Sequence, residues 1–174
     1  MSSCGEMMRI HRVLKESAIL LSLKTHGLYP GDANPPESEL NRVQEGVIAE
    51  FAAVFEAAGH VSNEKKLKED LLAREQRTST AIGQGIAFPH VRTQQARRFC
   101  IAIGRSTTGL PFGSFDHKLV HVFVAMITPP HDDKFFLRIE QTLAQSFAYS
   151  TDLYDAIMSA ETAGEVVRVF AQSI

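Results

Sequence analysis

The chain has 174 residues, 44% of them hydrophobic, which is enough apolar material for one globular core. Lys and Arg (18) nearly balance Asp and Glu (20), and no segment gathers the positive charge that nucleic acid requires, which excludes that class of partner. The longest apolar runs, such as 122–127, fall far short of the roughly 20 residues that cross a bilayer, and residues 1–10 lack the apolar core of a secretory signal. We therefore expect a single cytoplasmic domain over residues 1–174, without membrane insertion.

The first part of the chain predicts a strand, a loop and two helices. Residues 18–23 are short and apolar enough for a first buried strand. Residues 25–40 then contain three prolines and two glycines, which indicates a surface loop that either offers a partner surface or has no function. Apolar residues next recur at helical spacing up to a stop at Gly59, and a second helix follows a cap at Ser62 or Asn63.

The second part of the chain predicts a sheet and further helices. Strands are expected at residues 85–89, 99–105 and 120–128, and the last is so continuously apolar that it belongs at the centre of a sheet. Helical spacing returns in residues 135–147, 153–158 and 166–170. Helices on both faces of one sheet give a three-layer α/β domain, an α/β/α sandwich.

The segment from Thr78 to Arg92 carries the strongest indication of chemistry. Gly83 and Gly85 permit unusual backbone conformations, and Pro89 ends a strand by removing a hydrogen-bond donor, which places His90 at a strand terminus. An imidazole has an ordinary pKa near 6.5, so much of this side chain is neutral and nucleophilic at cytosolic pH.

Basic and hydroxyl side chains accompany this histidine in the sequence, namely Arg74, Arg77, Ser79, Thr80 and Arg92. Such a set suits a dianionic phosphoryl group and indicates phosphate chemistry rather than acyl chemistry. The same pattern also fits a plainer interpretation, in which His90 ends a strand and hydrogen-bonds a carbonyl while the glycines serve a turn. Spacing leaves both interpretations open.

Other patterns of chemistry fail on their spacing. The glycine string that leads to Phe88 lacks the third glycine of a dinucleotide fingerprint. His117 and His121 would stand about 13 Å apart along a strand, too far to share one metal ion. Cys4 and Cys100 have no further ligands beside them, which argues against a disulfide framework or a thiolate zinc site. We therefore expect neither a metal nor a cofactor.

The order of elements, together with the string Gly-x-Gly-Ile-Ala-Phe-Pro-His at residues 83–90, resembles the fructose/mannitol-type enzyme IIA of the bacterial phosphotransferase system. The sequence looks most like the nitrogen-regulatory, PtsN-type branch, and the resemblance covers roughly residues 8–170. It implies a mixed sheet between helices, and a domain that takes a phosphoryl group from the phosphocarrier protein HPr onto His90. It also implies that Arg74, Ser79 and Thr80 contact the phosphate.

The resemblance implies two kinds of downstream partner. Sugar-transporting relatives pass the phosphoryl group to a IIB domain, whereas in the nitrogen branch the phosphorylation state alters binding to regulatory proteins such as sensor kinases and potassium transporters. Because the chain shows no IIB or membrane segment, we expect the regulatory role, with a separately encoded IIB as the alternative. A further alternative is a non-catalytic binding module of the same fold.

The sequence departs from the family pattern at two places. The family's second histidine, which helps to hold the phosphoryl group, falls on Phe136, which cannot donate a hydrogen bond. His131, five residues earlier, is a candidate substitute, and the acidic pair that follows it is better explained as a helix cap than as a cation site. The second departure is the insertion at residues 25–40, where relatives are usually shorter.

Overall fold

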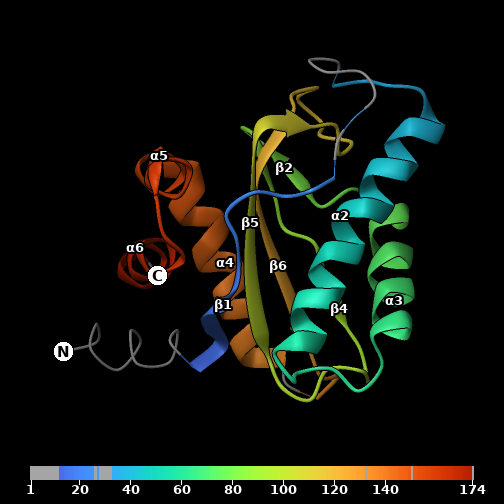
Figure 1. The fold of residues 1–174 in the computed structure, drawn as a ribbon, viewed down its shortest axis with the longest axis vertical. Coiled ribbons are helices and arrows are strands. Elements are labelled where there is room, and N and C mark those ends of the chain that lie inside the picture. The colour runs from blue at the N-terminus through green and yellow to red at the C-terminus, as the bar shows by residue number, and fades with distance from the viewer. Residues whose placement is uncertain (1–11, 26, 28–32, 132, 150, 174) are drawn as a thin grey trace.

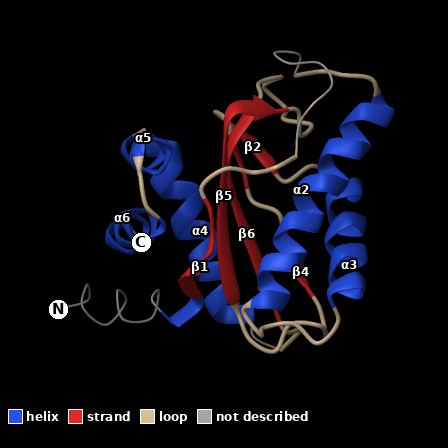
Figure 2. Cartoon of the chain, viewed as in Figure 1, coloured by secondary structure: helices blue, strands red, loops and turns tan. Residues whose placement is uncertain are grey.

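A six-stranded mixed sheet lies between two layers of helices in the computed structural model, which describes residues 12–25, 27, 33–131, 133–149 and 151–173 (Figure 1). The strands follow the order β1 (Leu14–Leu20), β5 (Cys100–Leu110), β6 (Val120–Thr128), β3 (Ile86–Ala87) and β2 (Ala81–Gly83), and β4 (His90–Arg92) also pairs with β6. One face carries α2 (Glu37–Ala57) and α3 (Glu64–Arg77), and the other carries α4 (Asp133–Tyr149), α5 (Asp152–Ser159) and α6 (Ala163–Ser173) (Figure 2). The expected three-layer α/β architecture is confirmed.

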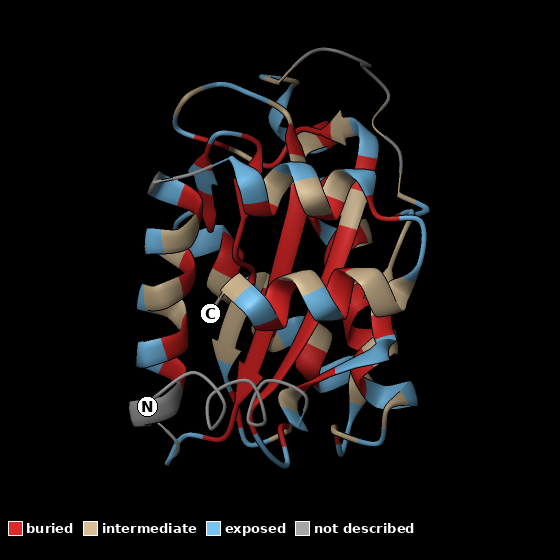
Figure 3. Ribbon diagram, turned by 90° about the vertical axis from the view of Figure 1, so that its left-hand side faces the viewer, coloured by how far each residue is buried: buried red, intermediate tan, exposed pale blue. Residues whose placement is uncertain are grey.

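The central strand β6 divides the interior into two hydrophobic cores. Successive side chains of a strand point to opposite faces, so Phe123 packs with the α2 and α3 core, whereas Val124 packs with the core under α4, α5 and α6. Both residues are fully buried, as Figure 3 shows for most of the sheet. The prediction of a central strand at residues 120–128 is therefore confirmed.

Local signals account for the buried face of α2 and for the start of α3. The α2 stripe of Val43, Val47 and Phe51 is buried against the sheet. The Oδ1 atom of Asn63 accepts a hydrogen bond of 3.0 Å from the backbone N–H of Lys66, which identifies Asn63 as the cap of α3.

Two parts of the sheet differ from the sequence prediction. The first strand runs from Leu14 to Leu20 rather than over residues 18–23, because it pairs in parallel with β5, with Leu14 opposite Ile101. The predicted strand at 85–89 is instead two short strands, β3 and β4, which lie in line along β6 and are separated by Phe88 and Pro89. The hairpin of β2 and β3 was not predicted from the sequence, since it depends on pairing across a turn with positive φ at Gln84.

The predicted insertion at residues 25–40 is only partly described, since residues 26 and 28–32 lie outside the described residues. Its last part is helical, because α2 begins at Glu37. In the described part, the Oδ1 atom of Asn34 lies 2.9 Å from Nδ1 of His117, in the loop before β6. The described part of the insertion therefore contacts the end of the sheet opposite β4. Within the described ranges, no helix combines the length and apolar character needed to cross a bilayer.

Candidate active site

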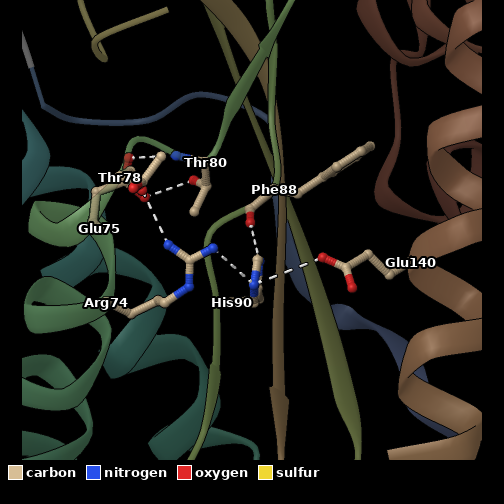
Figure 4. Close-up of polar contacts among 7 residues, drawn as sticks. All are labelled: Arg74, Glu75, Thr78, Thr80, Phe88, His90 and Glu140. Atoms are coloured by element: carbon tan, nitrogen blue, oxygen red, sulfur yellow. Dashed lines mark hydrogen bonds and ion pairs between the residues drawn. The ribbon is translucent and has the colours of Figure 1, made fainter.

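His90 lies at the edge of the sheet where the two helical layers face each other. It is the first residue of β4 and stands opposite Met126 of β6. Figure 4 shows its ring between Arg74, which comes from α3, and Glu140, which comes from α4 on the other side of the sheet. This position combines groups that are far apart in the sequence.

The orientation of the His90 ring determines which nitrogen can react. Its Nδ1 atom lies 2.8 Å from the carbonyl oxygen of Phe88. A carbonyl can only accept a hydrogen bond, so Nδ1 carries the proton and the lone pair of the neutral ring is on Nε2. Nε2 lies 3.2 Å from an NH2 nitrogen of Arg74, which donates to it. The hydrogen bond to a carbonyl that the plainer interpretation expects is therefore present, and it orients the ring so that Nε2 faces the guanidinium of Arg74.

The surroundings of His90 favour the neutral imidazole. Its side chain is 16% exposed. Burial lowers the pKa of His90 from its ordinary value and Arg74 and Arg92 lower it further, whereas the bond to Phe88 and the charge of Glu140 oppose the shift. A neutral ring with its lone pair on Nε2 is the nucleophilic form.

Arg74 is held in position by the end of α3. It lies in the last turn of the helix, where a cation is favourable, and its NH1 atom donates a 3.0 Å hydrogen bond to the carbonyl of Thr78. The neighbouring Glu75 is buried and accepts two hydrogen bonds from Thr80, one from the backbone N–H (2.8 Å) and one from the hydroxyl (2.6 Å). Burial raises the pKa of Glu75. These bonds join the end of α3 to the start of β2.

The other predicted site residues divide into two groups. Arg92 lines the same cleft as His90, and its guanidinium carbon lies 5.5 Å from the centre of the Phe136 ring. The hydroxyl of Ser79 instead donates to the carbonyl of Phe112 at 2.7 Å, and that of Thr80 donates to Glu75. Neither Ser79 nor Thr80 lines the cleft.

Phe136 lies beside His90, at the position where the resemblance implies a second histidine. Its ring is 2% exposed, and its centre lies 5.6 Å from that of His90. His131 is exposed in the turn before α4 and does not line the cleft. The structure thus brings together His90, Arg74, Arg92 and Phe136.

The cleft over His90 has a volume of about 700 Å³ and contains more charge than the sequence interpretation included. Its charged lining residues besides His90 are Lys66, Asp70, Arg74, Arg77, Arg92 and Glu140. Leu137 at its rim is 50% exposed. Glu140 was missed in the sequence, although it lies one helical turn after Phe136 and so shares its face of α4. Among the described residues, no group of three or more metal-binding side chains comes together.

Comparison with known proteins places the chain in a family. Residues 39–173 match the family model described as "Phosphoenolpyruvate-dependent sugar phosphotransferase system, EIIA 2". The chain belongs to this family. The matched residues include every element of the described structure except β1 and the start of α2.

Two curated relatives are components of fructose systems. The chain is 27% identical over 131 residues to the fructose-specific EIIA component of Haloferax volcanii, a match that covers 75% of this chain and 84% of the relative. It is 38% identical over 82 residues to the fructose-specific EIIABC component of Bacillus subtilis, which covers 47% of this chain. This second match spans only 13% of the length of the Bacillus protein.

Solved structures share the fold. The nitrogen regulatory protein IIA-Ntr of Neisseria meningitidis matches with a TM-score of 0.77 at 23% identity, over 93% of this chain and 99% of that one. The mannitol enzyme IIA of Escherichia coli, solved in complex with phosphorylated mannitol enzyme IIB, matches with a TM-score of 0.68 at 15% identity. That match covers 91% of this chain and 99% of the other.

Proposed function

We propose that this protein accepts a phosphoryl group on Nε2 of His90 from an HPr-type phosphocarrier and acts as a regulatory IIA of the nitrogen type. The observation that carries the proposal is the hydrogen bond from Nδ1 of His90 to the Phe88 carbonyl, which leaves the Nε2 lone pair directed into a cationic cleft. Membership of the EIIA 2 family supports the same chemistry.

The transfer step needs only groups that the protein supplies. The Nε2 lone pair attacks phosphorus, an Nε2–P bond forms, and the bond between phosphorus and the donor breaks, so that the electron pair leaves with the donor. The proton on Nδ1 remains in its hydrogen bond to Phe88. Arg74 and Arg92 neutralise the charge on the phosphoryl oxygens, which is the main requirement for stabilising such a transition state. Thr80 contributes indirectly, because it holds the carboxylate of Glu75 in the last turn of α3, next to Arg74.

The rim of the cleft suits a transient protein partner. Leu137 is half exposed beside the buried Phe136, and basic side chains such as Lys66 and Arg77 surround the opening. A phosphoryl relay requires weak docking, because each complex must separate after transfer. We assign this rim to the phosphocarrier and to the proteins that receive or sense the phosphoryl group.

A second candidate function is a sugar-specific IIA that passes its phosphoryl group to a separate IIB. The two fructose-specific relatives favour it, and the mannitol IIA of the same fold was solved with its phosphorylated IIB. Loss of label from His90 that depends on a IIB and a sugar would favour this candidate over regulation.

The proposed transfer can be tested by incubating the protein with enzyme I, HPr and phosphoenolpyruvate. The wild type should gain the mass of one phosphoryl group, and His90→Ala should gain none. His121→Gln, at the other end of β6, is the matched control and should label as the wild type does. An unlabelled wild type, under conditions that label a known IIA, would reject the proposal.

The same variants separate a relay from a non-catalytic binding module. A regulator that responds to phosphorylation should bind its targets differently when His90 carries the group, so the set of proteins captured should change with phosphoenolpyruvate in the wild type only. Capture that is identical in the wild type and in His90→Ala, with and without phosphoenolpyruvate, would instead indicate a binding module.

A further inference from the structure

Glu140 is an acidic group beside His90 that phosphoryl transfer does not require. Its Oε1 atom lies 3.7 Å from Nε2 of His90, on the side of the ring that faces α4 (Figure 4). Among the described residues, Glu140 comes within ion-pair distance of His90 alone, and the neutral ring has neither a charge nor a proton on Nε2 to pair with the carboxylate. No hydrogen bond or ion pair that stabilises the fold in the described part of the chain therefore explains why the Glu140 carboxylate lies beside His90.

The position of Glu140 conflicts with a phosphoryl group on Nε2. A gap of 3.7 Å cannot hold a phosphorus atom with its oxygens between the nitrogen and the carboxylate at normal contact distances. The phosphoryl oxygens also carry the same sign of charge as the carboxylate, and like charges at this range repel strongly in a partly buried site. The side chain of Glu140 is 31% exposed, so it can rotate toward solvent when the group arrives.

The same carboxylate has the opposite effect on the imidazole ring once the Nε2–P bond begins to form. Attack by Nε2 gives the ring a positive charge, because Nδ1 keeps its proton, and a nearby carboxylate stabilises that charge. After transfer, the repulsion acts against a group of roughly two negative charges, whereas the attraction acts on a single positive charge. The net effect of Glu140 is therefore to destabilise the phosphorylated state relative to the free one.

We propose that Glu140 sets the phosphoryl-transfer potential of His90, keeping phosphohistidine sparsely populated and quick to pass its group on. This role rests on the proposed function of His90. In the onward step the Nε2–P bond breaks, a bond from phosphorus to the acceptor forms, and the electron pair returns to Nε2, where Arg74 donates to it again. Phe136, which packs on the ring and contributes no hydrogen bond to the group, acts in the same direction.

The inference is tested by measuring the phosphorylated fraction at equilibrium. The protein is incubated with enzyme I, HPr, phosphoenolpyruvate and pyruvate, so that the ratio of phospho-HPr to HPr is fixed, and each species is quantified by intact mass. Glu140→Gln should raise the ratio of phosphorylated to free protein about five- to tenfold, and Glu140→Ala should do the same. Glu56→Gln removes the same charge from an exposed position on α2 and should leave the ratio unchanged.

Two further measurements separate an electrostatic role from a structural one. The difference between the wild type and Glu140→Gln should shrink as salt is raised from about 0.05 to about 0.5 M, because screening weakens the repulsion. Glu140→Gln should also lower the pKa of His90 in an NMR titration, since the charge of Glu140 raises it.

The outcomes distinguish this inference from the proposed function. A labelled wild type with an equal or lower ratio in Glu140→Gln would overturn the role of Glu140 and leave phosphorylation of His90 intact. If neither protein takes up a phosphoryl group while a known IIA is labelled, both proposals are wrong.

Discussion

Two histidines lie beside opposite ends of β6 in similar local settings, His90 on β4 and His121 on β6 itself. At one end Nδ1 of His90 bonds to the carbonyl of Phe88 (2.8 Å), and at the other Nδ1 of His121 bonds to the carbonyl of Ser106 (3.0 Å). Both rings line clefts, of about 700 and 860 Å³. A carbonyl bond at Nδ1 therefore does not by itself make a phosphoryl acceptor.

The difference between the two ends lies in what faces the second nitrogen. Nε2 of His90 receives a hydrogen bond from Arg74, and Arg92 stands beside the same cleft. Around His121, Lys118 is the only lysine or arginine among the described residues that line the cleft. In the proposed function, the guanidinium groups from α3 and β4 are what distinguish the His90 end as the phosphoryl site.

Loss of the Arg74 guanidinium should slow phosphorylation of His90 more than any other substitution that keeps His90 itself. Arg74→Met should slow phosphorylation of His90 about 100-fold, because a preorganised donor to the transferring group is lost. Arg74→Lys should recover part of the rate, since it restores charge without the planar pair of donors. Lys118→Met, in the cleft at the other end, should change the rate less than twofold. Initial rates of labelling by phospho-HPr measure all three, and equal rates for Arg74→Met and the wild type would refute the role of the guanidinium.

Placing a second imidazole at position 136 should change the labelling rate by a smaller factor than the loss of Arg74. Phe136→His should speed labelling a few-fold, because a donor would then face the phosphoryl group. The variant should also lose about 1–3 kcal/mol of unfolding free energy, since Phe136 is nearly fully buried. Phe136→Leu is the control, which disturbs packing without adding a donor. If both variants change the rate equally, the gain is due to packing and the hydrogen-bond argument fails.

Changing the pH should affect the labelling of His90 least. Because burial lowers the pKa of His90, its ring should titrate below the ordinary value of about 6.5, and labelling should stay nearly constant from about pH 8 to about pH 6.5. The same shift stabilises the folded state at pH values above the unfolded pKa, and that contribution is lost as pH falls through the folded pKa. An NMR titration, with the His90 signal assigned by its absence in His90→Ala, measures the value. A midpoint above 6.5 would contradict the burial argument.

Much of the scaffold was predictable because its signals are local. The stripe of Val43, Val47 and Phe51 predicts a helix with one buried face, and Asn63 predicts where the next helix begins. The apolar run of β6 likewise predicts a strand covered on both faces. His90 was singled out in the same way, through a short motif, although it begins β4 rather than following the end of a strand at 85–89.

The partners of His90 were only partly predictable. Arg74 and Arg92 were expected near it and line its cleft. Ser79 and Thr80 were expected to contact phosphate, but their hydroxyls are bonded to Phe112 and Glu75, which no sequence spacing indicates.

The helices, the central strand and the choice of His90 as the candidate nucleophile follow from the sequence, because periodicity, caps and turn residues act over a few neighbouring positions. Two features are visible only in the folded protein. β3 and β4 pair with the same side of β6, and α4 brings Oε1 of Glu140 to within 3.7 Å of Nε2 of His90. Those features depend on which faces pack together across the sheet. Packing joins residues 50 positions apart through contacts that leave no local pattern in the chain.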